Sequence, residues 1–222
     1  MVDIVKYTEL STADLLVDAV YEGDVGSRLS GEPISELIPK TANLGGFQAS
    51  GKGKRKKYVA LCTGGEDEDW PDRLNMSTGV FTYYGDNRNP GTELHETPLR
   101  GNRILSDTFE LLHAVPDQRK DICPFFVFLK YPTTVSARSF QFKGVAVPGS
   151  TDLPESADLI AFWTTTSKGR YLNYRAIFTI LDAPKISRAW IKDLQAGNLP
   201  SKHAPSAWFD WVETGKYKPL VS

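Results

Sequence analysis

The sequence from Tyr58 to Gly91, YVALCTGGEDEDWPDRLNMSTGVFTYYGDNRNPG, indicates most about the fold and the site of this chain. Its two apolar runs, 58–62 and 80–84, have the length and composition of β-strands. The segment between them is long, polar and acidic, and it ends in aromatic and carboxylate side chains. We therefore predict two strands joined by this loop as a hairpin, with rings and carboxylates gathered at the loop ends.

A strongly basic segment precedes the first of these strands. Five of the six residues from Lys52 to Lys57 are Lys or Arg, and a glycine-rich stretch, 45–51, lies before them. A solvated surface loop is the simplest interpretation of such a run, and a loop that binds phosphates or enters a groove is the alternative. A carboxylate flanked by aromatic faces can hold a flat hydrogen-bonding ring such as a nucleobase, so the two neighbouring features fit one ligand.

Composition bounds the class of protein. The chain has 222 residues, a formal net charge of −1 and 41% hydrophobic residues, so it can bury a sizeable core and is not a polycation. Any contact with nucleic acid must then come from local clusters of charge. The N-terminus lacks a basic-then-apolar signal, and no apolar run approaches the roughly 18 residues of a membrane span, so we expect a soluble cytoplasmic protein without membrane contact.

Few residues offer catalytic or metal chemistry. Cys62 and Cys123 lie in apolar runs, and we expect buried thiols there and no disulfide. The three histidines are far apart in sequence, and neither a Cys/His ligand cluster nor a glycine-rich nucleotide motif is present. We expect no cofactor and no nucleophilic catalysis. The acidic residues 66–72 could hold a cation, and an exposed acidic loop is the simpler interpretation.

The remaining chain predicts strands bracketed by helices. Runs of apolar or alternating residues from Pro124 onward predict four to six strands with hairpin-length connections, hence an antiparallel, strongly curved sheet or barrel. We expect a single α+β domain, with helices over 11–23, 103–114, 186–196 and 205–213 and one helical turn near 34–38.

The motifs now described resemble those of a known family. WPDRLN, then FTYYGDNRNPG, then ELHETPLRGN before a helix, are similar to the N-terminal recognition domain of AspBHI-type modification-dependent restriction endonucleases, relatives of the MspJI group. The resemblance implies an SRA/PUA-like fold, which is a curved antiparallel β-barrel flanked by helices. It also implies an N-terminal segment, 1–42, packed on a recognition domain, 43–222, that flips a modified cytosine out of duplex DNA.

The resemblance also implies roles for residues of the central stretch. Tyr83, the tyrosine of F-T-Y-x-G, would stack on the flipped base, and Tyr58 or Trp70 would supply the second ring. Asp72 of WPD would accept a hydrogen bond from the cytosine amine, with Asp69 as its rival. A carboxylate suits cytosine because thymine presents a carbonyl at the same position.

Cations around this stretch are candidates for contacts to the DNA backbone or grooves. They are Lys52, Lys54, Arg55, Lys56 and Lys57 of the basic segment, Arg88 after the second strand, and Lys168 and Arg170 at a later turn. For each of them a solvated surface position is the competing interpretation.

The expected partner is methylated double-stranded DNA, or DNA with a related modified cytosine. Full-length members of the family resemble endonucleases with a separate C-terminal PD-(D/E)xK nuclease domain, which this chain does not contain, so we expect a non-catalytic reader of a prokaryotic restriction system. Three alternatives stay open: a PUA/YTH-like binder of modified RNA bases, a metal-dependent hydrolase using the acidic loop and His95, and a plain interaction domain.

Overall fold

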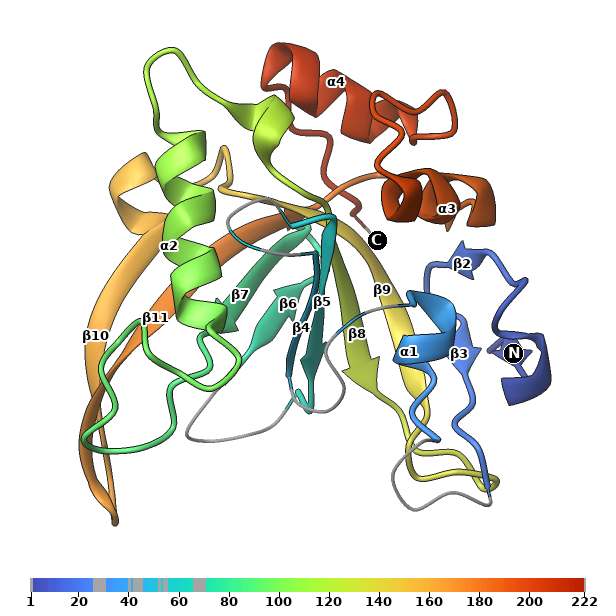
Figure 1. Ribbon diagram of the computed structural model, residues 1–222, viewed down its shortest axis with the longest axis horizontal. Coiled ribbons are helices and arrows are strands. Elements are labelled where there is room, and N and C mark those ends of the chain that lie inside the picture. Colours follow the sequence, from blue (N-terminus) through green and yellow to red (C-terminus); the bar gives the residue numbers. More distant parts are fainter. Residues whose placement is uncertain are drawn as a thin grey trace.

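The computed structural model describes residues 2–25, 31–39, 41, 46–51, 53, 56–65 and 71–221. A large mixed sheet runs through the centre of the molecule, with helices packed outside it (Figure 1). A separate small sheet pairs β2 (Leu15–Leu16) with β12 (Lys185–Ile186). The described strands of the large sheet are β1 (Ile4–Val5), β3 (Val20–Tyr21), β4 (Phe47–Ser50), β5 (Tyr58–Thr63), β6 (Arg73–Asn75), β7 (Val80–Tyr84), β8 (Phe125–Lys130), β9 (Phe140–Pro148), β10 (Leu159–Thr166) and β11 (Gly169–Ile180).

The large sheet does not close into a barrel. Its strands follow the order β4-β5-β8-β9-β11-β7-β6, with β10 also paired to β11 and with β3 paired to β9 and β1. Within the described residues no register joins β4 to β6, the strands at the two ends of this order, which are four and three residues long. The α+β class is confirmed, and the predicted closure is wrong. We call the gap between β4 on one side and β6 and β7 on the other the open seam.

Strand direction also differs from the prediction. Most pairs are antiparallel, but β5 lies parallel to β8 and β1 parallel to β3. All six residues of β5 are buried, as expected for a central strand with a parallel neighbour. The predicted hairpin of 58–62 with 80–84 is wrong, because β5 pairs with β4 and β8, whereas β7 pairs with β11 and β6.

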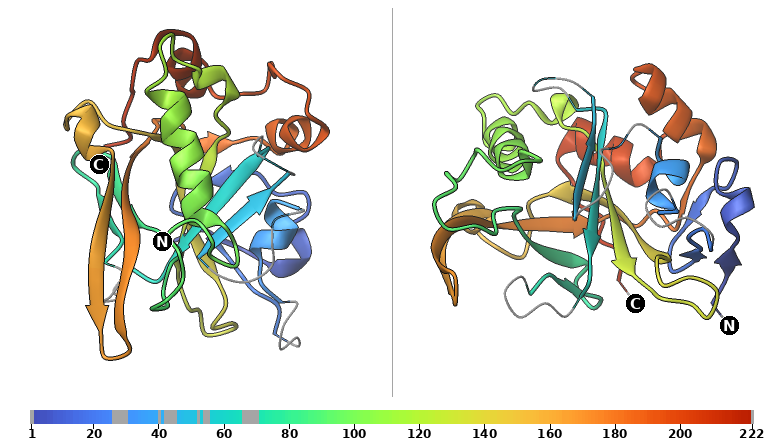
Figure 2. Two further views of the ribbon diagram at one scale, coloured as in Figure 1. Left: turned by 60° about the vertical axis from the view of Figure 1, so that its left-hand side comes forward. Right: turned by 60° about the horizontal axis from the view of Figure 1, so that its bottom comes forward.

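The helices beyond residue 100 confirm the prediction closely. They are α2 (Gly101–Leu112), α3 (Arg188–Ala196) and α4 (Ser206–Thr214). Nearer the N-terminus, α1 (Ile34–Leu37) is the single helical turn expected near 34–38. Short 3₁₀ turns occur at Tyr7–Glu9, Arg119–Asp121 and Glu155–Ala157. Figure 2 shows α2 lying along one face of the sheet beside the long β10–β11 pair, while α3 and α4 cover another end.

The predicted helix over 11–23 is wrong. The chain forms β2 and β3 there, joined through Asp18 in a left-handed conformation with φ of 65°. The apolar pairs of this segment have spacings compatible with helix or strand, and sheet pairing with β12 and β9 decides between them. Arg188 holds the segment, because its guanidinium donates to the carbonyl oxygens of Leu10 and Ala13 and also to that of Leu37 in α1.

The core is rich in aromatic side chains. Phe125 and Phe178 have ring centroids 4.8 Å apart, and the ring centroids of Phe128 and Phe142 are 5.2 Å apart.

Both cysteines are free thiols, as expected; Cys62 is buried and Cys123 is partly buried. In the described chain, no helix has the length and apolar character needed to cross a membrane.

Candidate functional site

A pocket of about 340 Å³ lies at the open seam and brings together several of the predicted site residues. It lies between the start of β4, the end of β7 and the segment that leads into β6. The sheet thus provides two separate walls, and the loops 85–89 and 98–99 complete the rim. Its described lining is Gly46, Phe47, Cys62, Asp72, Tyr83, Tyr84, Gly85, Asp86, Arg88, Asn89, Pro98 and Leu99.

An aromatic ring lies on each wall of this pocket. Tyr83 of β7 is 3% exposed, and its ring centroid lies 6.2 Å from that of Phe47 of β4 across the seam. Burial raises the pKa of the Tyr83 hydroxyl well above its usual value, and the nearby Asp72 and Asp86 carboxylates raise this pKa further. The hydroxyl is therefore a neutral group at physiological pH.

Asp72 is fixed in place beside these rings. Its Oδ1 accepts a hydrogen bond of 2.7 Å from the backbone N–H of Tyr84, which ties the segment before β6 to the end of β7. The side chain is partly exposed and lines the pocket. A carboxylate held this way can accept a hydrogen bond from a ligand amine with little loss of its own freedom.

The second carboxylate of the pocket, that of Asp86, is engaged in the protein itself. It accepts hydrogen bonds from the Thr97 hydroxyl at 2.8 Å and from the backbone N–H groups of Gly101 and Asn102, each at 2.9 Å. These last two donors belong to the first turn of α2, so Asp86 caps that helix from a distant part of the chain. Asp86 is thus held by the start of α2, whereas Asp72 lines the pocket from the segment tied to β7.

Gly85 explains the last letter of the F-T-Y-x-G motif. A Cβ at Gly85 would lie 1.8 Å from Oδ1 of Asn102 and 2.6 Å from Oδ1 of Asn173. These two buried side chains are bonded to each other at 3.0 Å, and Nδ2 of Asn173 donates to the Gly85 carbonyl oxygen. The loop at the pocket can therefore run against this amide pair only where the side chain is missing.

Tyr58, the other described residue predicted for the base pocket, lies elsewhere. The Tyr58 ring is buried in the core against Phe126, and its hydroxyl donates to the carbonyl oxygen of Pro39, so it does not line this pocket. Asp69 and Trp70 lie outside the described residues.

The predicted DNA-contacting cations are spread over two sides of the site. Arg88 is exposed at the pocket, and Lys168 and Arg170 are exposed at the turn between β10 and β11. Lys57 is partly buried and donates to the carbonyl oxygen of Gln195. The basic residues Lys52, Lys54 and Arg55 lie outside the described residues.

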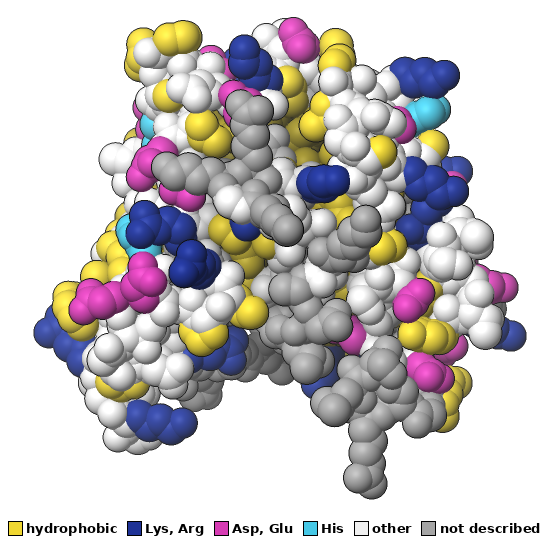
Figure 3. Space-filling model, in the orientation of Figure 1, with side chains coloured by type: hydrophobic (Ala, Val, Ile, Leu, Met, Phe, Trp, Pro, Cys, Tyr) yellow, Lys and Arg dark blue, Asp and Glu magenta, His cyan; other side chains and the backbone are white. Residues whose placement is uncertain are grey.

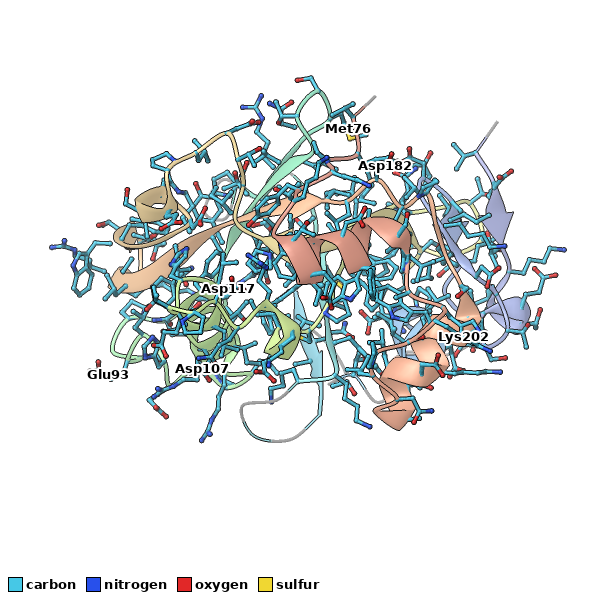
Figure 4. All side chains as sticks on the ribbon, turned by 90° about the horizontal axis from the view of Figure 1, so that it is seen from above. Met76, Glu93, Asp107, Asp117, Asp182 and Lys202 are labelled. Carbon is cyan, nitrogen blue, oxygen red and sulfur yellow. The ribbon has the colours of Figure 1, made fainter. Side chains whose placement is uncertain are left out.

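A second cleft, of about 330 Å³, follows the pocket at the open seam along the chain. Leu99 lines the pocket, and the next residue, Arg100, lines this cleft. It is lined by charged groups from α2 and the loops beside it, namely Lys56, His95, Glu96, Arg100, Arg103 and Asp107. Figure 4 shows Asp107 on α2 and Glu93 in the preceding loop at one edge of the molecule. A third cleft, of about 390 Å³, lies between α3 and α4, and Lys56 and Lys57 are its predicted site residues.

Sequence reasoning missed the far wall of the pocket. Phe47 and Cys62 come from strands that pair with each other, and only the open seam brings them near Tyr83. The signal present in the sequence was the glycine at position 46, next to Phe47. The structure explains this glycine, because a Cβ there would lie 2.9 Å from the Cys62 carbonyl oxygen. Pro98 and Leu99 belong to the PLRGN motif, whose role in the rim follows only from the fold.

Metal chemistry receives no support from the described part of the chain. Among those residues, no three His, Cys, Asp or Glu side chains come together as a metal site would need. The acidic residues 66–69 lie outside the described ranges.

Comparisons with known proteins agree with this geometry. A family model described as "Restriction endonuclease AspBHI N-terminal" matches residues 15–222. The DNA recognition domain of the cytosine modification-dependent restriction endonuclease LpnPI is 44% identical, with a TM-score of 0.94, over 100% of this chain and 97% of that chain. The DNA modification-dependent restriction endonuclease AspBHI is 39% identical, with a TM-score of 0.90, over 99% of each chain.

A more distant structure shares the fold. The MspJI restriction endonuclease in complex with a 27-mer oligonucleotide is 19% identical, with a TM-score of 0.72, over 95% of this chain and 55% of that chain. The chain thus spans about half the length of that enzyme. A comparison with curated proteins gave no match.

Proposed function

Because the chain belongs to the AspBHI N-terminal family of restriction endonucleases, we propose that it is a DNA recognition module for modified cytosine. The module binds duplex DNA and takes 5-methylcytosine, or a related modified base, into the pocket at the open seam by base flipping. Its SRA-like sheet carries the site, and the N-terminal segment 1–42 packs on the recognition domain 43–222 as part of one unit. The observation that carries the proposal is the fixed Asp72 carboxylate beside the Tyr83 ring.

The chemistry of the pocket distinguishes cytosine from thymine. The N4 amine of cytosine donates to the Asp72 carboxylate, whereas thymine would place a carbonyl oxygen against it. Tyr83 and Phe47 supply aromatic faces, and stacking contributes on the order of 1–3 kcal/mol per base. That contribution offsets the few kcal/mol needed to take a base out of the stack.

The 5-methyl group needs an apolar contact at the rim. Pro98 and Leu99 are the apolar side chains contributed there by the loop before α2. A methyl group buried against them gains roughly 0.8 kcal/mol, so the modification adds a moderate increment to the binding free energy. Most of the selectivity for cytosine itself comes from the Asp72 hydrogen bond.

Phosphates of the same duplex have cations to bind. Arg88 lies at the pocket, and Arg100, Arg103 and Lys56 line the adjoining cleft. Together with Lys57 and the basic residues Lys52, Lys54 and Arg55, they provide the sequence-independent part of the affinity. This part is expected to weaken as salt concentration rises.

Within the whole protein the module directs cleavage. A nuclease domain, fused to the module or supplied by another chain, would cut DNA near the bound base in the prokaryotic cytoplasm. This chain contributes the recognition and no catalytic residue of that reaction.

A binding titration at fixed salt tests the proposal. Duplexes with one central 5-methylcytosine, in several flanking contexts, are compared with the unmodified duplex and a matched RNA. Binding about fourfold tighter to a methylated duplex, equivalent to the roughly 0.8 kcal/mol of the methyl group, is the expected result. Equal binding to both duplexes would refute base-specific recognition, and preference for the RNA would point to a modified-RNA binder instead.

A further inference from the structure

The β10–β11 pair forms a two-stranded ribbon with an unusual charge pattern. From Leu159 to Leu181 the sequence contains Lys168, Arg170 and Arg175 and no Asp or Glu, although the whole chain has a net charge of −1. Strand β10 pairs only with β11 in the described part of the sheet, so it forms an edge. Figures 1 and 2 show the turn of this ribbon projecting beyond the rest of that side of the molecule.

An aromatic–cation pair lies on the outer face of this ribbon. Trp163 is 55% exposed, and the Arg170 guanidinium carbon lies 4.3 Å from the centroid of its ring. Trp163 is opposite Leu172 and Arg170 is opposite Thr165, so the two side chains are diagonal neighbours on one face. The contact holds the planar guanidinium in a defined place while both side chains stay accessible.

The ribbon is tied to the loop that forms the pocket. Nδ2 of Asn87 donates to the Leu172 carbonyl oxygen at 2.9 Å. A Cβ at Gly169, in the turn of the ribbon, would lie 3.2 Å from Cγ of Pro90. Arg88, which lines the pocket, is two residues before Pro90, and two residues of extended chain span at most about 7 Å. The turn is therefore held at a fixed, short distance from the pocket.

We propose that this ribbon enters the major groove beside the flipped base and that Arg170, held by Trp163, reads a guanine of the flanking sequence. The inference rests on the proposed function and adds a specificity-determining residue to it. The major groove is about 12 Å wide, admits a two-stranded ribbon and presents a distinct donor and acceptor pattern for each base pair, whereas the pattern of the minor groove is degenerate. Arginine bidentate to O6 and N7 of guanine is the commonest specific contact in that groove.

The geometry limits which base pair is read. A span of about 7 Å from Arg88 to Pro90, plus one side-chain contact, corresponds to roughly three steps of 3.4 Å along the duplex. We therefore expect the guanine within about three base pairs of the modified cytosine. Trp163 acts as a positioning residue, and the ordinary phosphate contact expected for an exposed arginine is the competing role.

Atomic substitution in the DNA tests the contact. Duplexes with one 5-methylcytosine and several flanking guanines are titrated with the wild-type chain and with Arg170→Ala, each dG being replaced in turn by 7-deaza-dG, which lacks N7. We expect one position within three base pairs where 7-deaza-dG weakens wild-type binding about fivefold or more. Arg170→Ala should bind the natural duplex roughly tenfold more weakly and be insensitive to that replacement.

Control variants separate positioning from charge. Trp163→Ala should lose most of the 7-deaza effect, and Trp163→Phe, which keeps a ring, should restore it. Lys202→Ala removes an exposed cation in the loop between α3 and α4 and should leave binding unchanged (Figure 4). Because Trp163 and Arg170 are exposed, all variants should keep the wild-type melting temperature.

Each other outcome refutes a stated part. A wild-type chain that prefers methylated DNA but shows no 7-deaza effect would overturn the guanine contact alone. A uniform loss on all duplexes in Arg170→Ala, with a smaller salt dependence, would make Arg170 a phosphate contact and overturn its reading role. Absence of any preference for the methylated duplex would refute the proposed function itself. Dimerisation in sedimentation that Trp163→Ala abolishes would show the ribbon to be a protein interface.

Discussion

Replacing Asp72 by asparagine provides the most direct test of the pocket. In the wild type, Oδ1 of Asp72 accepts from the Tyr84 N–H at 2.7 Å, and the carboxylate lines the pocket, where it can also accept from a ligand amine. An asparagine that keeps the Tyr84 bond through its single oxygen must turn its NH₂ group toward the pocket. Two donors, the asparagine NH₂ and the cytosine N4 amine, would then face each other.

The size of the effect follows from the bond that is lost. A hydrogen bond to a charged group contributes about 1.5–3 kcal/mol, and an unpaired buried donor costs a similar amount. At about 1.36 kcal/mol per factor of ten, the methylated duplex should bind roughly 10- to 150-fold more weakly. Unmodified cytosine carries the same N4 amine, so binding through the flipped base should weaken on that duplex as well, whereas the salt-dependent phosphate contacts should not change.

The assay is a titration of both duplexes with both chains at one salt concentration. Thermal unfolding serves as the control, because Asp72→Asn preserves the bond to Tyr84 and should keep the wild-type melting temperature. Unchanged affinity for the methylated duplex in a folded Asp72→Asn chain would refute the role of Asp72. If Asp69→Asn weakened this binding in its place, the rival carboxylate would be the one that binds the base.

Three further predictions concern stability. Gly85→Ala should destabilise the chain by more than about 3 kcal/mol or prevent folding, because its Cβ would overlap Oδ1 of Asn102. Gly64→Ala is the control, because no atom lies within 4 Å of a Cβ there, and its free energy of unfolding in denaturant should change by less than about 0.5 kcal/mol. Arg188→Met leaves three carbonyl oxygens without their donor and should cost about 3 kcal/mol, or roughly 6–12 °C in melting temperature by calorimetry; an unchanged melting temperature would contradict this role. The Lys185 ammonium, and after it the Arg188 backbone N–H, lower the pKa of the Asp14 carboxyl. Ionised Asp14 therefore stabilises the fold above the unfolded pKa of about 3.9, and this contribution is lost as pH falls through the lower folded pKa. The urea midpoint of Asp14→Asn should fall less than that of the wild type over that acidic range, and parallel curves would contradict this role of Asp14.

Local signals in the sequence were sufficient for much of the fold. The helix α2 follows from its apolar face and from Pro116 beyond it, and α3 and α4 end at Gly197 and Gly215, both left-handed. The errors arise where pairing between distant segments decides. Residues 15–21 have spacings that suit helix or strand, and only β12, β9 and β1 make them strands.

The residues of the site were predictable only where they lie in one short motif. Asp72 and Tyr83 lie in a short motif, and the structure places both in one pocket. Asp86 follows the same motif, but its task as a cap of α2 depends on a helix that begins fifteen residues later, at Gly101. Phe47 could not be inferred, because its position opposite Tyr83 depends on the path of the whole sheet.

The open seam makes the occupied pocket a structural element in its own right. In the described residues, no backbone hydrogen bond joins β4 to β6 or β7, so side chains around the pocket hold these two walls together. A base that stacks on Tyr83 of β7 and also contacts Phe47 of β4 would bridge the walls where a barrel would have its missing ladder. By linkage the free energy of unfolding should then rise by RT ln(1 + [DNA]/Kd), about 2.7 kcal/mol at a hundredfold excess over Kd. Amide hydrogen exchange in β4 and β6 should slow more than in β8, so the DNA completes the fold that recognises it.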